Sequence, residues 1–414
     1  MQNQCRTGRK ENKKLRIVFW GTGNTAKKYI DRIKRLSDRF EVVAFTDSCQ
    51  NDNNTCFCWE GFKLIAPKAI CELDVDLLCI LSIWEWEIRR TIYEERVFDL
   101  SRIISFHEIC MMDSFDMELD ICYEKELENM HPQQKESAEM WRDYEYLKRK
   151  YSYVLCDKCY WKIEAKRKAY FEKDIRPIWI LWLQGMDRAP ELVEICIRSL
   201  KRALGDKEFI CLLDAENVWN YIDLPDYIVQ KWENGVISNT HFSDLIRLRL
   251  LNVYGGIWID ATVYFTGSKL PDYMKNSKLF MFNMREHWSV CTEPRIAANW
   301  LISAQSENKM LIILEALLHE YWKRENRAIN YYFFHIFWTM VVECRPKEWE
   351  QVENVIRDPA QLLNGKLTKE FQEDSFEYLK QMSDIHKLSY KEAYMDAGKN
   401  SFWAKLCEID RRNR

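Results

Sequence analysis

The sequence has little glycine and proline and no excess of charge of one sign, and each shortage excludes a class of protein. Only 12 glycines and 9 prolines occur among 414 residues, which excludes a disordered or collagen-like chain. The formal net charge is −3, so the basic excess of a nucleic-acid-binding protein is missing and we expect no nucleic-acid partner. The length predicts about two or three globular domains.

Long apolar runs are missing as well. No run approaches the roughly 18 apolar residues of a membrane-spanning helix. The opening residues, MQNQCRTGRKENKKLR, lead into a short strand-like run and not into the apolar centre of a signal peptide. The 15 cysteines are odd in number and follow no framework, which favours the reduced thiols of the cytosol. We expect a cytoplasmic protein, with peripheral attachment at the inner face of a membrane left open.

Short apolar runs do occur, and they alternate with amphipathic stretches near the start of the chain. This alternation predicts a parallel sheet with helices on both faces, a doubly wound α/β arrangement. We assign residues 14–115 to such a Rossmann-like domain. The expected strands are 15–20, 41–48, 76–83 and 102–106, and a helix is expected around 85–98.

A glycine motif lies at the first strand–helix junction of this domain. Gly21 and Gly23 in "GTGNTA" allow a tight turn at the start of a helix, where a phosphate can bind. Asp47 ends the second strand, at the place where a ribose hydroxyl is held in such folds. The motif fits a site for NAD or another nucleotide, and it fits equally a Rossmann-like fold whose site is degenerate. The domain resembles the nucleotide-binding-like domain attached to several bacterial surface-polysaccharide enzymes.

Two further segments follow. Residues 116–175 are charged and aromatic with helical spacing, and we predict a helical linker. We assign residues 176–414 to a second α/β domain. The sequence indicates no catalytic or binding role for its last part, residues 346–414. The expected strands of this domain are 177–185, 208–214, 227–232, 257–265 and 278–283, with a helix at 189–204.

The segment "SDLIRLRLLNVYGGIWIDAT" (243–262) carries charges into an apolar run. Asp244 and Arg247 share one face of a predicted helix that is otherwise apolar, so both should be buried. A buried charge is costly unless it is paired. The two residues could simply pair with each other, or they could face a cleft. A glycine pair then starts a strand that delivers Asp260 at its carboxyl end, where ligands bind in α/β sheets.

This segment resembles the signature of capsular polysaccharide synthesis proteins, which are similar to glycosyltransferase family 32. The shared pattern is S-D-x-x-R, an aliphatic run, and then Y-G-G-x-Y/W-x-D-x-D. Residues 178–201 resemble the opening strand and first helix of that family, and residues 299–317 resemble a later helical segment. The resemblance implies a GT-A fold and a retaining transfer of a hexose. It also implies a nucleotide-sugar donor, typically a UDP-sugar, and a glycan or lipid-linked glycan acceptor in capsular or surface polysaccharide synthesis.

The resemblance assigns roles to individual residues. Asp244 and Arg247 match positions that contact the sugar and ribose of the donor, and Asp260 matches the first acid of the D-x-D motif. The residues expected to bind the nucleotide or the donor sugar are Trp182, Gln184, Gly185 and Asn299.

The metal site departs from the family pattern. The second acid of the motif, which commonly ligates Mn²⁺, is Thr262 here. A divalent cation, Mn²⁺ or Mg²⁺, held by Asp260 and a later residue such as His335 is the corresponding expectation. A lone histidine in an aromatic run such as "NYYFFHIFW" is, however, more often a packed core residue than a ligand.

Two other functions stay open on the sequence alone. The first is an NAD-dependent sugar-modifying enzyme that uses residues 14–115. The second is a non-catalytic nucleotide-sugar binder in which Thr262 marks a decayed site.

Overall fold

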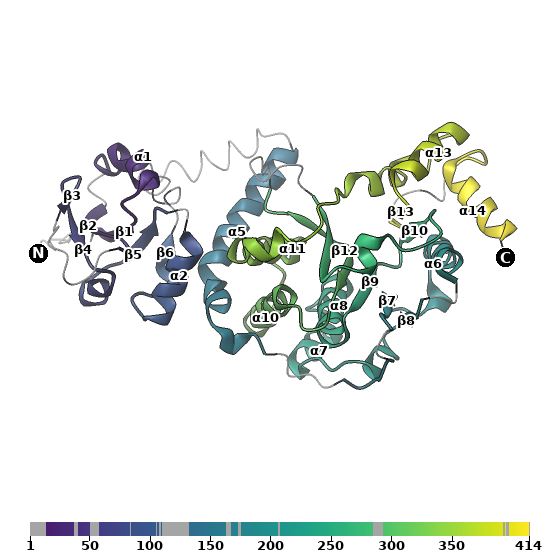
Figure 1. Ribbon diagram of the computed structural model, residues 1–414, viewed down its shortest axis with the longest axis horizontal. Helices are drawn as coiled ribbons and strands as arrows, with labels where there is room; N and C mark the ends of the chain where they lie inside the picture. Colours follow the sequence, from purple (N-terminus) through teal and green to yellow (C-terminus); the bar gives the residue numbers. More distant parts are fainter. Residues whose placement is uncertain are drawn as a thin grey trace, which may run out of the picture. The chain divides into compact units, whose positions relative to one another are not determined.

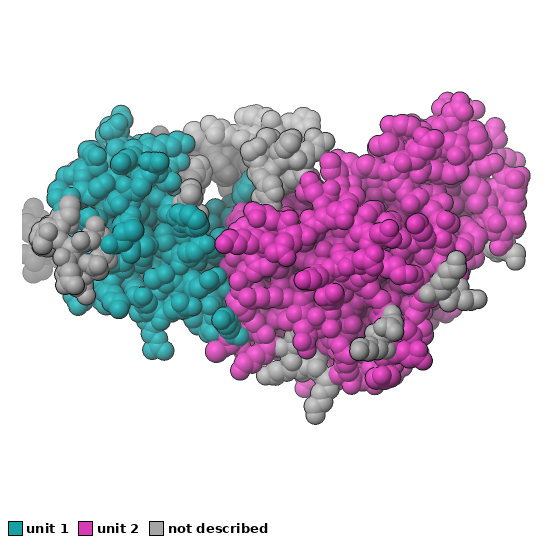
Figure 2. Space-filling view, in the orientation of Figure 1, with its two compact units in different colours: residues 1–158 teal, residues 159–414 magenta. Residues whose placement is uncertain are grey.

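The computed structural model shows a chain that folds as two compact units, residues 1–158 and 159–414 (Figure 2). The division of the sequence into 14–115, 116–175 and 176–414 stays a prediction. The structure describes residues 14–413 except for 37–39, 50–57, 83, 105, 107–108, 110–131, 163–166, 173–174, 206–207, 285–292, 392–393 and 395–396.

The first unit is built on a six-stranded sheet with the order β3-β4-β2-β1-β5-β6 (Figure 1). All neighbouring strands are parallel except β3, which runs antiparallel to β4. The strands are β1 (Leu15–Trp20), β2 (Phe40–Thr46), β3 (Cys58–Trp59), β4 (Phe62–Ile65), β5 (Leu77–Ile80) and β6 (Ile103–Ile104). The helices are α1 (Asn24–Ile33), α2 (Glu85–Glu94) and α5 (Pro132–Cys156).

Successive residues of β1 face opposite sides of this sheet, and each side has its own core. Phe19 packs in one core with Ala26 of α1. Trp20 packs in the other core with Ile88 of α2 and Cys156 of α5. Helices therefore cover both faces, and the predicted doubly wound α/β class is confirmed.

The second unit contains a five-stranded mixed sheet with the order β11-β12-β9-β7-β8. β7 pairs in parallel with β8 and β9, while β12 runs antiparallel to both β9 and β11. A separate antiparallel ribbon joins β10 to β13. The strands are β7 (Ile178–Leu181), β8 (Ile210–Leu213), β9 (Gly256–Ile259), β10 (Val263–Phe265), β11 (Leu279–Asn283), β12 (Ala297–Ala304) and β13 (Ile385–Lys387).

Helix α8 (Asn239–Tyr254) lies at the centre of the second unit. It packs against the sheet strands β7, β9 and β12 and against α10 (Figure 1). Ser238 caps its start by accepting a hydrogen bond from the His241 backbone, and Gly255, with φ +72°, ends it. The other helices are α6 (Glu191–Leu204), α7 (Asp226–Glu233), α9 (Asp272–Lys275), α10 (Lys309–Arg324), α11 (Phe333–Cys344), α12 (Pro346–Trp349), α13 (Glu373–Met382) and α14 (Phe402–Arg412).

Three details of the predicted second domain are wrong. Residues 227–232 form helix α7 and not a strand, because Pro225 and Asp226 provide a helix start and only Ile228 is fully buried. The predicted strand 257–265 is interrupted after Ile259 by a turn in which the Val263 amide donates to the Asp260 carbonyl. The segment 299–317 begins within strand β12 and becomes helical only at Lys309.

None of the helices that the structure describes is long and apolar enough to cross a bilayer.

Stability should fall with acid because His386 of β13 is buried as a neutral group. Burial lowers the pKa of His386 to about 4, although a hydrogen bond to the Ser383 backbone acts in the opposite direction. The unfolded chain, with an ordinary pKa near 6.5, takes up a proton first as the pH falls, so stability is lost between about pH 6.5 and 4.

The expected loss from this residue is up to about 1.4 kcal/mol per pH unit in that window. Urea unfolding at neutral and acidic pH would measure it. The variant His386→Gln, which keeps an amide near Thr266, should show a shallower pH dependence. Equal slopes for the two proteins would contradict the prediction.

Candidate active site

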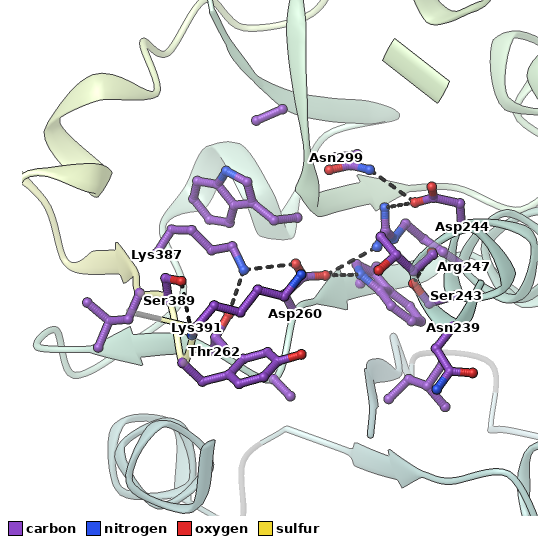
Figure 3. Close-up of a pocket in the computed structure, with 18 of the residues that line it drawn as sticks. Asn239, Ser243, Asp244, Arg247, Asp260, Thr262, Asn299, Lys387, Ser389 and Lys391 are labelled. Atoms are coloured by element: carbon purple, nitrogen blue, oxygen red, sulfur yellow. Dashed lines mark hydrogen bonds and ion pairs between the residues drawn. The ribbon is translucent and has the colours of Figure 1, made fainter. Parts of the chain in front are cut away.

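A cavity of about 570 Å³ lies beyond the carboxyl ends of β7 and β9 in the second unit (Figure 3). This volume falls within the range of small-molecule sites in proteins. Its wall combines residues that follow β7 and β9, one face of α8, part of β12, the start of α11 and the segment after β13. It is therefore assembled from parts of the chain that are far apart in sequence.

Seven of the predicted site residues line this cavity, and the other four do not. Gly185 adjoins Gln184 but is not part of the wall. Gly21, Gly23 and Asp47 belong to the first unit. The lining members of the predicted set are Trp182, Gln184, Asp244, Arg247, Asp260, Asn299 and His335.

Arg247 connects the two carboxylates of the signature. Its Nη1 donates to Asp244 Oδ1 at 2.7 Å, and its Nη2 donates to Asp260 Oδ1 at 3.2 Å. Asn299 of β12 donates its amide to the same Asp244 oxygen at 3.0 Å. The guanidinium lies 4.7 Å from the centroid of the Trp258 ring, which adds a cation–π contact. Asp244 and Arg247 thus do pair with each other, and the pair also faces the cavity.

The surroundings shift the pKa values of the two carboxylates, Asp244 and Asp260, in opposite directions. Burial raises the pKa of Asp244 to about 7, and the Asp260 charge acts in the same direction against the pull of Arg247. Burial also acts to raise the pKa of Asp260, but Lys387 and Arg247 hold it below its ordinary value. Asp260 is therefore the stable anion at neutral pH, and Asp244 can share or take up a proton there.

Lys387 is a site residue that the sequence does not reveal. Its ammonium lies 3.0 Å from Asp260 Oδ2 and 2.5 Å from Thr262 Oγ1 (Figure 3). Strand β13 places it there, because Lys387 pairs with Val263 of β10, the residue next to Thr262. Lys387 is separated from Asp260 by 127 residues, and no spacing in a single sequence signals such a contact.

The segment after β13 completes the wall on this side. The Leu388 amide donates to the Thr262 carbonyl at 3.0 Å, which anchors the segment beside Asp260. Tyr390 places its ring 5.3 Å from that of Trp182, edge to face, and both rings line the cavity. The part of the chain to which the sequence assigned no chemistry therefore provides part of the cavity wall.

The described side chains around Asp260 do not suit a divalent cation. Both carboxylate oxygens already accept from cationic groups, and the ammonium of Lys387 bridges Asp260 and Thr262, the two positions of the D-x-D pattern. A metal ion there would meet that ammonium at close range in a partly buried place. Within the described residues, no group of three histidine, cysteine or acidic side chains is arranged as a metal site. A divalent cation at Asp260 stays a prediction.

His335 lies in the cavity wall as a neutral imidazole. Burial lowers the pKa of His335 to about 3, and the charges of Arg295, Arg247 and Arg357 act in the same direction. Its buried Nδ1 has no hydrogen-bond partner in the described chain. The three neighbouring guanidinium groups would repel a metal ion at His335, so this environment gives no support to the metal-ligand role. A neutral imidazole remains suited to hydrogen bonding with an uncharged ligand group.

In the glycine motif of the first unit, the Leu81 backbone packs closely against Gly21, and Asp47 hydrogen-bonds to neighbouring residues of the turn. A β-carbon at Gly21, where φ is +128°, would meet the Leu81 carbonyl oxygen at 2.5 Å. Asp47 accepts from the Thr22 amide at 2.9 Å, from the Thr22 hydroxyl at 2.8 Å and from the Cys49 amide at 3.2 Å. Partial burial raises the pKa of Asp47, but these hydrogen bonds hold it below its ordinary value. The aspartate orders the turn, and a role with a ribose stays a prediction.

The second unit thus combines an α/β fold with a cavity at the ends of its strands, and an Asp–Arg–Asp cluster lines that cavity. These are features of an enzyme that binds a small polar substrate. The chain belongs to the capsular polysaccharide synthesis protein family, whose model matches residues 123–406. A second family model, described as C2185-like, N-terminal, matches residues 13–104. The predicted membership of the capsular polysaccharide synthesis family is thereby confirmed.

Curated relatives match over shorter stretches. The O-glycosyltransferase braB of Annulohypoxylon truncatum is 37% identical over 92 residues, 20% of this chain and 22% of that protein. The glycosyltransferase afumC of Aspergillus fumigatus (strain CBS 144.89 / FGSC A1163 / CEA10) is 32% identical over 102 residues, 23% of this chain and 26% of that protein. The chain thus spans about a quarter of the length of these relatives.

Two solved glycosyltransferases are also similar. PaToxG glycosyltransferase has 15% identity and a TM-score of 0.29, covering 57% of this chain and 87% of that one. A glycosyltransferase involved in the glycosylation of the major capsid of PBCV-1 has 9% identity and a TM-score of 0.25, covering 57% and 99%. Scores this low support no conclusion about shared fold or chemistry.

Proposed function

We propose that the second unit is a glycosyltransferase that moves a sugar from a nucleotide-sugar to a glycan acceptor in surface polysaccharide synthesis. The observation that carries the proposal is the convergence of Asp244, Arg247 and Asp260 in one cavity. The proposal includes a UDP-sugar donor, a GT-A fold and a capsular product, which the match to the capsular polysaccharide synthesis family supports. A lipid-linked glycan is one form that the acceptor would take.

The charges of the cavity favour a diphosphate. Two of the cationic side chains are matched by nearby acids outside the wall, because Arg295 pairs with Glu293 and Arg357 pairs with Asp358. One net positive charge then remains in the wall, which attracts an anion. The charged wall residues are Arg247, Arg295, Arg357, Lys387 and Lys391 against Asp244 and Asp260.

Different side chains of the cavity would bind different parts of the donor. Asp244 and Asn299 present a carboxylate and an amide that suit the hydroxyl groups of the donor sugar. Arg247 offers a fixed guanidinium to phosphate or sugar oxygens. Trp182 and Tyr390 provide aromatic surface in the cavity wall, on which a base can stack.

The reaction that we propose keeps the anomeric configuration. The acceptor hydroxyl oxygen forms a bond to the anomeric carbon on the face from which the nucleotide diphosphate departs. The diphosphate leaves with the electron pair of the broken carbon–oxygen bond and takes the proton of the acceptor hydroxyl. No enzyme nucleophile or general base is required, so the protein contributes positioning and stabilisation of the departing charge.

The direct test is release of nucleoside diphosphate from a panel of UDP-, GDP- and ADP-sugars, with and without oligosaccharide acceptors. Slow hydrolysis or transfer with one donor would support the proposal and identify the sugar. Binding of a donor without any release would favour the non-catalytic binder. Reduction of a nicotinamide cofactor in the presence of a nucleotide-sugar would favour the dehydrogenase alternative of the first unit.

A further inference from the structure

We infer that the ammonium of Lys387 takes the place of a divalent cation in this site and binds the diphosphate of the donor directly. The inference rests on the proposed function and names the group that would neutralise the leaving diphosphate. It predicts sugar transfer that does not require a metal.

The ammonium of Lys387 lies between the two residues that correspond to the D-x-D acids. Lys387 Nζ lies 3.0 Å from Asp260 Oδ2 and 2.5 Å from Thr262 Oγ1. In the family pattern both positions are acids, and the second commonly ligates the metal. The ammonium therefore bridges the two residues between which a cation would be held (Figure 3).

The single charge of Lys387 balances the single carboxylate that remains at these two positions. Two carboxylates with one divalent cation sum to no net charge, and one carboxylate with one ammonium sums to no net charge as well. Exchanging the second acid for Thr262 removes one negative charge, and Lys387 supplies one positive charge in place of two. The net charge at these positions is therefore the same in both arrangements. The presence of Thr262 does not imply that the site has lost its function.

The ammonium of Lys387 keeps one donor available for a ligand. A lysine has three N–H donors, and two of them are directed to Asp260 and Thr262. The third meets no acceptor within the described part of the chain. The Lys387 side chain is 23% exposed and lines the cavity, so this donor is open to a ligand.

The backbone that carries Lys387 is held by hydrogen bonds to β10 and Thr262. Lys387 lies in the ladder between β10 and β13, and the Leu388 amide donates to the Thr262 carbonyl on the next residue pair. The backbone that carries the lysine is therefore fixed to the backbone that carries Thr262. A fixed cation beside a developing negative charge stabilises that charge without reorganisation.

During transfer the lysine would act on the leaving group. As the carbon–oxygen bond to the sugar breaks, its electron pair passes to the terminal phosphate oxygen. The free N–H of Lys387 donates to that oxygen, and the acceptor proton neutralises it. Lysine is a strong phosphate-binding group as a point charge, although it offers less directional binding than arginine.

Equilibrium binding tests the inference with a readout other than activity. Titrations would use UDP, GDP, ADP and the matching nucleosides, each in excess EDTA and in Mn²⁺. For the diphosphate that binds the wild type, we expect the dissociation constants in EDTA and in Mn²⁺ to agree within about twofold. Lys387→Met should weaken that binding about 10- to 100-fold in both conditions and leave nucleoside binding unchanged.

The controls separate a ligand contact from a structural role. Lys380→Met removes an exposed lysine of α13 that pairs with Glu377, and it should bind like the wild type. Equal weakening of nucleoside and diphosphate by Lys387→Met would indicate a structural role and overturn the inference.

Two further outcomes distinguish this inference from the proposed function. Wild-type binding that needs Mn²⁺ would overturn the inference and leave a metal-dependent glycosyltransferase. Binding of none of the diphosphates in either condition would overturn both.

Discussion

Asp260→Asn is expected to lower the rate of sugar transfer by about 10²- to 10³-fold while the protein stays folded. Asp260 accepts from Arg247, Trp258 and Lys387, so it holds the two cations that the proposed function places beside the diphosphate. An asparagine removes the negative charge and keeps only one oxygen acceptor, so Arg247 and Lys387 can no longer both be held by this residue. Because the effect is on positioned charge, we expect most of the loss in kcat and less in KM.

Initial-rate kinetics with the preferred donor would measure this effect, and thermal unfolding would show that the variant is folded. Asp223→Asn is the matched control, because Asp223 is an exposed carboxylate with a lysine partner, Lys168, away from the cavity wall. It should transfer sugar like the wild type. Full activity of Asp260→Asn would contradict the assignment of the cavity.

Gly256→Ala is expected to destabilise the second unit by at least about 3 kcal/mol. Gly256 has φ +103°, and a β-carbon there would meet the Pro177 carbonyl oxygen at 2.2 Å and Trp179 Nε1 at 3.0 Å. Neither neighbour can withdraw easily. Pro177 accepts a hydrogen bond from the Ile257 amide, and Trp179 donates its indole N–H to the Gly255 carbonyl.

Urea unfolding followed by tryptophan fluorescence would measure this loss. Gly235→Ala separates strain from collision, because Gly235 also has a positive φ, +74°, but a β-carbon there meets nothing within 4 Å. Gly235→Ala should lower the free energy of unfolding by only about 1–2 kcal/mol. A similar cost for both variants would show that the close approach at Gly256 is not what requires glycine.

The signature segment can be predicted from the sequence because its determinants are local. The helical spacing, the glycine pair and the strand that follows are all contained within residues 243–262. The structure shows Asp244, Arg247 and Asp260 in one cavity, as these local features predict. The pairing of Arg247 with both carboxylates follows from the same short segment.

The opposite wall could not be predicted because it depends on pairing across the chain. Lys387 reaches Asp260 only through the ladder of β13 with β10, and β13 is three residues long, Ile385–Lys387. Tyr390 meets Trp182 for the same reason. Short apolar runs are ambiguous as well, as residues 227–232 show, since strand and helix spacing cannot be distinguished over six residues.

The first unit shows a different limit of sequence reasoning. The glycine turn and the strand–helix order predict its doubly wound fold, which the sheet order confirms. Asp47 fits a ribose-binding position in the sequence, yet its carboxylate accepts three hydrogen bonds from Thr22 and Cys49. Whether an acid at such a position serves a ligand or its own loop depends on side-chain geometry, which spacing does not contain.

The most direct test of the account is a crystal structure of the protein with the nucleotide-sugar, or its nucleoside diphosphate, bound. We predict that the diphosphate lies within hydrogen-bonding distance of Lys387 and Arg247, with the sugar against Asp244 and Asn299. A nucleotide bound at Gly21 and Asp47 in the first unit, with the cavity of the second unit empty, would contradict the account.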